Sequence, residues 1–215
     1  MSKKRIWPIG SLVIGLAFGL VLIITHMLVK PPAPPAELEG VLRKELRPIQ
    51  TFALQTHDRG PLEAKNLRGK WSFVFFGYLS CPDVCPNTLH ELNSFYRLLA
   101  DESGAEPEDL QIIFVSVDPA RDSTDNLARY VRHFNRRFIG ATAGKGAIDR
   151  ITRQFGASYL IEDETAPGQY LVAHTSAIFL VDPYGRLVAS FSQPHYASTL
   201  VSQYKKITAY FASAG

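Results

Sequence analysis

The chain contains one stretch that decides its fold, Phe73-Val-Phe-Phe-Gly-Tyr-Leu-Ser-Cys-Pro-Asp-Val-Cys-Pro86. It holds the only two cysteines of the 215 residues, Cys81 and Cys85. Residues 71–78 are aromatic and β-branched enough for a buried central strand. From Pro86 onward the apolar residues recur at helical spacing, at Leu89, Leu92, Phe95 and Leu99. The cysteines are therefore predicted to lie in a turn between a strand and a helix.

This turn places Cys85 at or next to the start of the helix. Pro86 suits the first helical turn, where its missing N–H leaves no hydrogen bond unmade. The positive end of the helix dipole stabilises a thiolate there. We therefore expect the pKa of Cys85 to be lowered.

Three interpretations of the cysteine pair remain open at this point. Free buried thiols are the simplest, but two unrelated cysteines rarely fall four positions apart in a turn. A structural disulfide would close so short a loop that it would stabilise the domain by only about 2 kcal/mol. The third is redox or metal chemistry, because two soft thiolates in one turn can chelate an ion or interconvert with a disulfide.

The N-terminal region has the pattern of a membrane anchor. We divide it into a basic tail (1–5), a transmembrane anchor (6–29) and a Pro-rich linker (30–44), followed by one domain (45–215). The apolar run from Ile9 to Val29 is 21 residues long, which at about 1.5 Å per residue approaches the thickness of a bilayer core. A cleaved signal peptide is the alternative, although its apolar core is usually only about 7–15 residues.

The flanking charges predict the orientation of this anchor. Lys3, Lys4 and Arg5 precede the span and only Lys30 follows it closely, so the N-terminus is predicted in the cytoplasm and the domain in the periplasm. The predicted location is thus the inner (cytoplasmic) membrane, with a single pass. Pro31 to Pro35 would form a stiff spacer of about 15 Å.

Charge excludes one class of partner. The whole chain carries a formal charge of +3, but residues 31–215 contain 19 Lys and Arg against 20 Asp and Glu, a net charge of −1. Nucleic-acid binding therefore has no electrostatic support. A basic helical face is interpreted as solvated, with docking of an acidic partner as the alternative; it consists of Arg129, Arg132, His133, Arg136 and Arg137.

The remaining pattern alternates strands with helices. Strands are predicted at 52–56, 71–78, 111–117, 138–140, 158–161, 177–181 and 187–191, and the last two form a hairpin through Asp182-Pro-Tyr-Gly185. Helices are predicted from Pro86, from the cap at Asp122 or Ser123 to Phe134, and over 147–155 and 197–211. This order predicts an α/β sandwich. With a dithiol in a strand-to-helix turn, it is typical of a thioredoxin-like fold with a central mixed β-sheet flanked by helices.

The histidines are less informative by themselves. His174 lies between two apolar segments, where a histidine is either a core residue or a ligand, and the sequence leaves both open. His90, about one turn past Cys85, is a weaker candidate ligand. His57 is expected to be solvated in a turn, and His195 to lie in the loop before the last helix.

Three motifs resemble the SCO/SenC family of membrane-anchored copper proteins, over nearly all of residues 45–212. They are Phe76-Gly-Tyr-Leu-Ser-Cys-Pro-Asp-Val-Cys-Pro86, Val115-Ser-Val-Asp-Pro-Ala-Arg-Asp122 and Tyr170-Leu-Val-Ala-His-Thr175. The resemblance implies Cys81, Cys85 and His174 as copper ligands. It also implies delivery of copper, as Cu(I) or Cu(II), to the copper-A-bearing subunit of cytochrome c oxidase, and an upstream periplasmic copper donor.

One position departs from the family pattern, and two enzymatic alternatives accompany the resemblance. Family members commonly place Asp directly before the histidine, where this chain has Ala173; a carboxylate there could tune the imidazole or the contact with a partner. A thiol-disulfide oxidoreductase would use Cys81 and Cys85 as catalytic residues without His174. A peroxidase of this broad fold usually has Thr three residues before its cysteine, where this chain has Tyr78.

Overall fold

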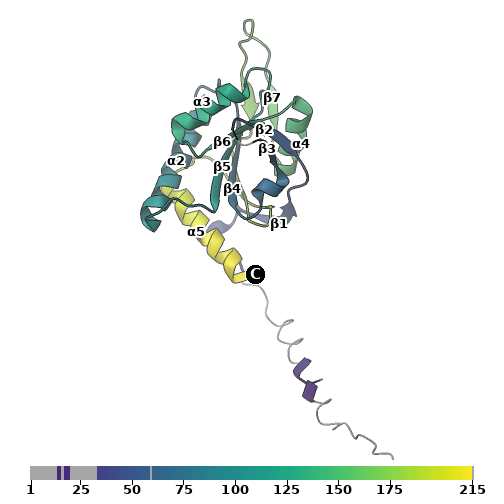
Figure 1. Cartoon of the computed structure of the whole chain (residues 1–215), viewed down its shortest axis with the longest axis vertical. Helices are drawn as coiled ribbons and strands as arrows, with labels where there is room; N and C mark the ends of the chain where they lie inside the picture. Colours follow the sequence, from purple (N-terminus) through teal and green to yellow (C-terminus); the bar gives the residue numbers. More distant parts are fainter. Residues whose placement is uncertain (1–13, 16, 20–32, 59, 215) are drawn as a thin grey trace, which may run out of the picture.

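The computed structural model describes residues 14–15, 17–19, 33–58 and 60–214 (Figure 1). Its strands are β1 (Leu42–Pro48), β2 (Ala53–Thr56), β3 (Pro61–Glu63), β4 (Trp71–Gly77), β5 (Leu110–Ser116), β6 (Ile139–Thr142), β7 (Tyr159–Ile161), β8 (Val172–His174), β9 (Ile178–Val181) and β10 (Arg186–Phe191). Its helices are α2 (Val84–Ser103), α3 (Thr124–Phe134), α4 (Lys145–Phe155) and α5 (Ala197–Ala214), with short 3-10 helices η1 (Ala36–Leu38) and η2 (Ala64–Leu67).

Most of the predicted anchor at 6–29 lies outside the described residues. Within those that are described, none of the helices combines the length and the apolar character needed to cross a bilayer.

The centre of the fold is a mixed eight-stranded sheet in the order β1-β10-β9-β4-β5-β6-β2-β3. Strands β4, β5 and β6 are parallel, and β9 pairs antiparallel with the other edge of β4. The predicted hairpin is β9–β10. The mixed central sheet and its flanking helices confirm the predicted α/β, thioredoxin-like architecture.

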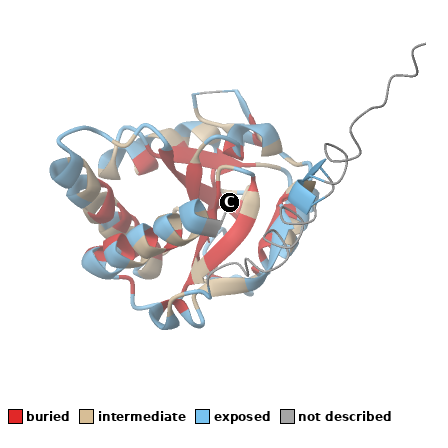
Figure 2. Ribbon diagram, turned by 90° about the horizontal axis from the view of Figure 1, so that it is seen from below, coloured by how far each residue is buried: buried red, intermediate tan, exposed pale blue. Residues whose placement is uncertain are grey.

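The β4 strand organises both layers because every one of its residues is buried. Successive side chains of a strand point to opposite faces of its sheet. Phe73 packs against Phe95 of α2 and Tyr204 of α5 on one face, whereas Phe76 packs against Phe155 of α4 on the other. The buried residues accordingly follow the sheet and the inward sides of the helices (Figure 2).

Three strands of the structure are not predicted from the sequence. Strand β1 reads Leu-Arg-Lys-Glu-Leu-Arg-Pro, which does not alternate, and it forms an edge strand against β10. Leu38, just before it, is fully buried, so the folded domain begins several residues before position 45. The other two, β3 and β8, have only three residues each, too few to show a period.

One prediction about a histidine is wrong. The side chain of His57 is inaccessible to solvent instead of solvated, because its Nδ1 lies against the backbone of Gly140 and its Nε2 lies 3.1 Å from Asp58. It belongs to the packing between β2 and β6.

The two ends of β4 have different neighbours. Trp71, at its start, packs against Tyr204 and Phe211 of α5, and Pro34 and Pro35 line a hollow together with Phe211. The first residues of the domain therefore lie at this end of the sheet. The cysteine turn follows Gly77 at the opposite end, about 20 Å away at about 3.3 Å per residue.

Candidate metal centre

The turn after β4 is built around the absence of a side chain at Gly77. A Cβ atom at this position would lie 2.6 Å from Cys85 Sγ and 2.8 Å from the ring of Phe114. Glycine is thus required by close packing and not by an unusual backbone angle. It allows the first turn of α2, which starts at Val84, to lie directly against the end of the strand.

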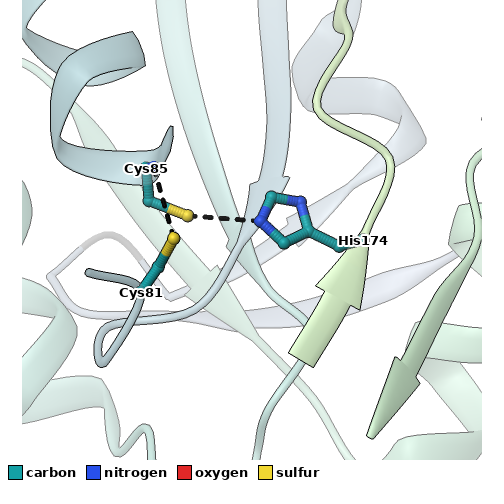
Figure 3. A group of neighbouring side chains, drawn as sticks. All are labelled: Cys81, Cys85 and His174. Atoms are coloured by element: carbon teal, nitrogen blue, oxygen red, sulfur yellow. Dashed lines mark hydrogen bonds between the residues drawn. The ribbon is translucent and has the colours of Figure 1, made fainter. Parts of the chain in front are cut away.

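Cys81, Cys85 and His174 come together at this turn (Figure 3). Cys85 Sγ lies 3.5 Å from His174 Nε2, and the backbone N–H of Cys85 donates to Cys81 Sγ at 3.4 Å. The two sulfurs and a ring nitrogen lie within 4.8 Å of one another. Cys85 is buried and the other two are half-buried. Both cysteines are free thiols.

The His174 ring is oriented for ligation. Its Nδ1 lies 3.1 Å from the carbonyl oxygen of Thr175, which an N–H at Nδ1 would satisfy. The Nε2 lone pair then faces the sulfurs, the arrangement found in most metal-binding histidines. The rings of Phe75 and Tyr78 meet the imidazole edge to face.

The prediction that the pKa of Cys85 is lowered is wrong. Cys85 has a raised pKa, first because its thiol donates a hydrogen bond to Cys81 and then because it is buried. The pKa of Cys81 is lowered to about 3, with the hydrogen bond from the Cys85 side chain as the largest cause and the backbone N–H of Cys85 also contributing. The backbone N–H of Cys85 in the first turn of α2 donates to Cys81 Sγ, which precedes the helix, so a negative charge is better stabilised on Cys81 than on Cys85.

His174 lies on a separate two-stranded sheet, β7–β8. It pairs with Tyr159, and Ala173 pairs with Leu160. Ala173 and Leu160 are both exposed. Because neighbouring residues of a strand face opposite sides, a side chain at position 173 points away from the ligand atoms. Of the two roles considered for a carboxylate there, the contact with a partner fits this orientation.

Asp122 stabilises the cysteine turn through a hydrogen bond to its backbone. Its Oδ2 accepts from the backbone N–H of Leu79 at 3.0 Å and from the hydroxyl of Ser116 at 2.6 Å. Burial raises the pKa of Asp122. The sequence signal was the pair of aspartates, Asp118 and Asp122, shortly after the buried strand β5, which lies beside β4 in parallel. The sequence predicts Asp122 only as a possible helix cap and as part of a family motif, and not as a partner of the cysteine turn.

The other candidate histidine is not part of this group. His90 is exposed on α2 and does not belong to the cluster of Cys81, Cys85 and His174. His195 is buried, and its Nε2 lies 2.9 Å from the carbonyl oxygen of Ser176. It therefore supports the segment that follows His174 instead of the ligand group itself.

Comparison with known sequences identifies relatives over most of the domain. The model of the SCO1/SenC family matches residues 42–209. The mitochondrial SCO2 homolog of Bos taurus is 33% identical over 163 residues, which are 75% of this chain and 60% of that protein. A Stutzerimonas stutzeri protein whose name describes it as copper-binding is 32% identical over 148 residues, 69% of this chain and 71% of that protein. The chain thus spans less than two thirds of the bovine relative.

Solved structures match the fold as well. Arabidopsis thaliana ScoI with copper bound has a TM-score of 0.69 and 30% identity, covering 76% of this chain and 100% of that one. Yeast Sco1 with copper bound has a TM-score of 0.67 and 30% identity, covering 76% of this chain and 88% of that one. Proteins of this fold and similar sequence therefore carry copper.

Proposed function

Because this chain belongs to the SCO1/SenC family, we propose that it is a copper metallochaperone for the assembly of cytochrome c oxidase. In this proposal Cys81, Cys85 and His174 bind the ion, and the receiving site is the copper-A centre of the oxidase. Copper is the cargo of the protein and not a resident cofactor.

The observation that carries this proposal is the convergence of three soft donors. Two sulfurs from one turn and an imidazole from a strand 89 residues later lie within 4.8 Å of one another. Two thiolates and one imidazole suit a three-coordinate Cu(I), and with a further ligand they suit tetragonal Cu(II). Because the pKa of Cys81 is lowered to about 3, binding near neutral pH would require the release of a proton from Cys85 alone.

The arrangement also suits release of the ion. Three protein ligands leave a coordination position free, and a thiolate of the target can occupy it before a ligand of this chain departs. Cys81 is the more accessible of the two cysteines. We therefore expect copper to pass by ligand exchange without being freed into solution.

A copper titration of the reduced full-length chain in detergent tests the proposal. We expect one copper per chain and, for Cu(II), a thiolate charge-transfer band. His174→Ala should weaken copper binding by about 100-fold or more, beyond the roughly 10–100-fold typical of an outer-shell change. His90→Ala is the matched control, because His90 is exposed on the same helix as Cys85. An unchanged affinity and band in His174→Ala would remove His174 from the site.

A second candidate, a thiol-disulfide oxidoreductase, is favoured by the low pKa of Cys81. The Cys81 thiolate would attack a target disulfide and release one target thiolate, forming a mixed disulfide. Cys85 would then give its proton to the released target thiolate, attack Cys81 Sγ and release the second target thiolate. The product on this chain is a Cys81–Cys85 disulfide, which an external dithiol reductant must reduce again.

One comparison separates the two functions. Disulfide reduction requires both cysteines but not His174, whereas copper delivery requires all three. His174→Ala should therefore retain reduction of a disulfide-containing peptide while losing copper. A variant that loses both activities equally would argue against a separate reductase function.

The location remains part of this proposal. We propose that residues 6–29 anchor the chain in the cytoplasmic membrane, with residues 1–5 in the cytoplasm and the domain in the periplasm, joined by the linker at 30–44. There the chain would meet an upstream copper donor and the oxidase subunit. Protease digestion of intact spheroplasts should degrade the domain.

A further inference from the structure

His174 lies in a small two-stranded sheet that gives little stability by itself. Strands β7 and β8 have three residues each and form a sheet separate from the central one. A two-stranded sheet of this size is marginally stable in water. We call the pair of strands β7 and β8 the ribbon. The distance between the imidazole of His174 and the two sulfurs is therefore set by contacts between this ribbon and the rest of the domain.

The strongest of these ties lies at Tyr170, four residues before His174. Arg121 Nη1 donates to the carbonyl oxygen of Tyr170 at 2.9 Å, and the Arg121 guanidinium carbon lies 3.5 Å from the centre of the Tyr170 ring. The hydroxyl of Tyr170 donates to Asp118 Oδ1 at 2.9 Å. The backbone, the ring and the hydroxyl of Tyr170 are thus all held by the turn of residues 118–122 that follows β5.

That turn is itself firmly anchored. Asp118 is fully buried at the end of β5, and its Oδ2 accepts from Arg121 Nε at 2.5 Å. The backbone N–H of Asp122 donates to the carbonyl oxygen of Asp118 at 3.0 Å. Arginine suits this position because its planar group can pair with a carboxylate, donate to a carbonyl and stack on a ring at once. A lysine ammonium can do only part of this.

The same turn holds both halves of the metal site. Asp122 fixes the cysteine turn through Leu79, and Arg121 fixes the ribbon of His174 through Tyr170. We propose that Arg121 is a positioning residue that sets the separation between the His174 imidazole and the two sulfurs by tying Tyr170 to Asp118. The importance of that separation for copper rests on the proposed function.

Other contacts hold the β7–β8 ribbon at other places. The hydroxyl of Tyr159 donates to Asp149 of α4 at 2.6 Å, and Tyr78 meets the backbone of Val172. Neither holds the segment at Tyr170. Loss of Arg121 is therefore expected to loosen residues 168–174 while the ribbon stays folded.

The test compares variants of the full-length reduced chain in detergent. Arg121→Lys keeps the charge beside Asp118, and Asp118→Asn with Arg121→Met removes both charges, so that no buried carboxylate is left unpaired. The first readout is hydrogen exchange of the amides at 168–174, which needs no copper. The second is Cu(I) affinity, measured by competition with a chelator.

The matched control is Asp182→Asn with Arg186→Met. Asp182 is also buried, and Arg186 Nε donates to its Oδ2 at 2.7 Å. This second ion pair lies in the β9–β10 turn, where Val181 pairs with Ser72 at the start of β4, the end remote from the site. It supplies an equivalent loss of a buried ion pair without touching the ribbon.

We expect faster exchange at 168–174 in both Arg121 variants and a fall in copper affinity of about 10–100-fold, with neither change in the control. Unchanged exchange at 168–174, or an equal loss in the control, would overturn the positioning role. If the unaltered chain binds no copper, the proposed function fails, and the exchange data still decide whether Arg121 holds the ribbon.

Discussion

Replacing Gly77 by alanine should disturb both the stability and the metal site. The added Cβ would lie 2.6 Å from Cys85 Sγ and 2.8 Å from a ring carbon of Phe114, distances at which the neighbours must move. Phe114 is fully buried in β5, so the start of α2 is expected to shift instead. Overpacking of this kind costs about 1–3 kcal/mol. For a domain of this size each kcal/mol lowers the melting temperature by about 2–4 °C.

The displaced atom is a proposed ligand, so copper affinity should fall together with stability. We expect a loss of about 10–100-fold, similar to that caused by other changes next to metal ligands. Circular dichroism melting of the reduced apo chain measures the first effect, and competition for Cu(I) measures the second.

Gly140→Ala provides the control for this experiment. A Cβ at Gly140 would lie 3.1 Å from Leu127 Cβ and 3.3 Å from a methyl group of Val131, between β6 and α3 and away from the ligands. It should lower the melting temperature and leave copper affinity unchanged. If Gly77→Ala melts within about 1 °C of the unaltered chain and keeps its affinity, the packing argument is refuted.

Three further predictions concern charge. Alkylation of Cys81 by iodoacetamide should stay nearly constant from about pH 8 to about pH 5, because its pKa is lowered to about 3, whereas an ordinary thiol loses about tenfold in thiolate per pH unit; a tenfold fall per unit would contradict the assignment. The pKa of Cys81 is lower in the folded than in the unfolded chain. The Cys81 thiolate therefore stabilises the folded chain fully above the unfolded pKa, and this stabilisation is lost as the pH falls toward 3. Over that pH range the melting temperature of the reduced chain should fall further than that of the Cys81→Ser variant. Ala173→Asp should change copper affinity by less than about fivefold, because an exposed charge contributes at most about 1 kcal/mol; a tenfold change in a copper competition assay would show that the side chain reaches the ligands.

Local signals explain which parts of the fold could be predicted. Strand β4 was predictable because it is a continuous run of aromatic and β-branched residues, and helix α2 because its apolar residues recur at helical spacing. Ser123 was predictable as a cap because its side chain accepts from the N–H of Asn126, three residues on. Strand β1 has no period, and only its pairing with β10 makes it a strand.

The site shows a different limit. Cys81 and Cys85 are only four positions apart in one turn, so their proximity was predictable, but His174 was ambiguous until the resemblance to a family was considered. The structure brings its Nε2 to 3.5 Å from Cys85 Sγ, and copper binding by the three residues stays a prediction. The difference in pKa between the two cysteines depends on their mutual hydrogen bond, on the deeper burial of Cys85 and on the N–H of Cys85 that donates to Cys81 Sγ, and no residue pattern contains that information.

The position of the site within the fold constrains how copper could be delivered. Pro34 and Pro35 lie near the start of β4, where they line a hollow with Phe211, and the ligand cluster lies past the other end of the strand, about 20 Å away. If residues 6–29 span the bilayer, as proposed, the linker adds its own length to this distance. The ligands would then face away from the membrane of this chain. A receiving site would have to stand on a domain that projects a similar distance from the bilayer, because a site at the lipid surface would meet the opposite end of the sheet.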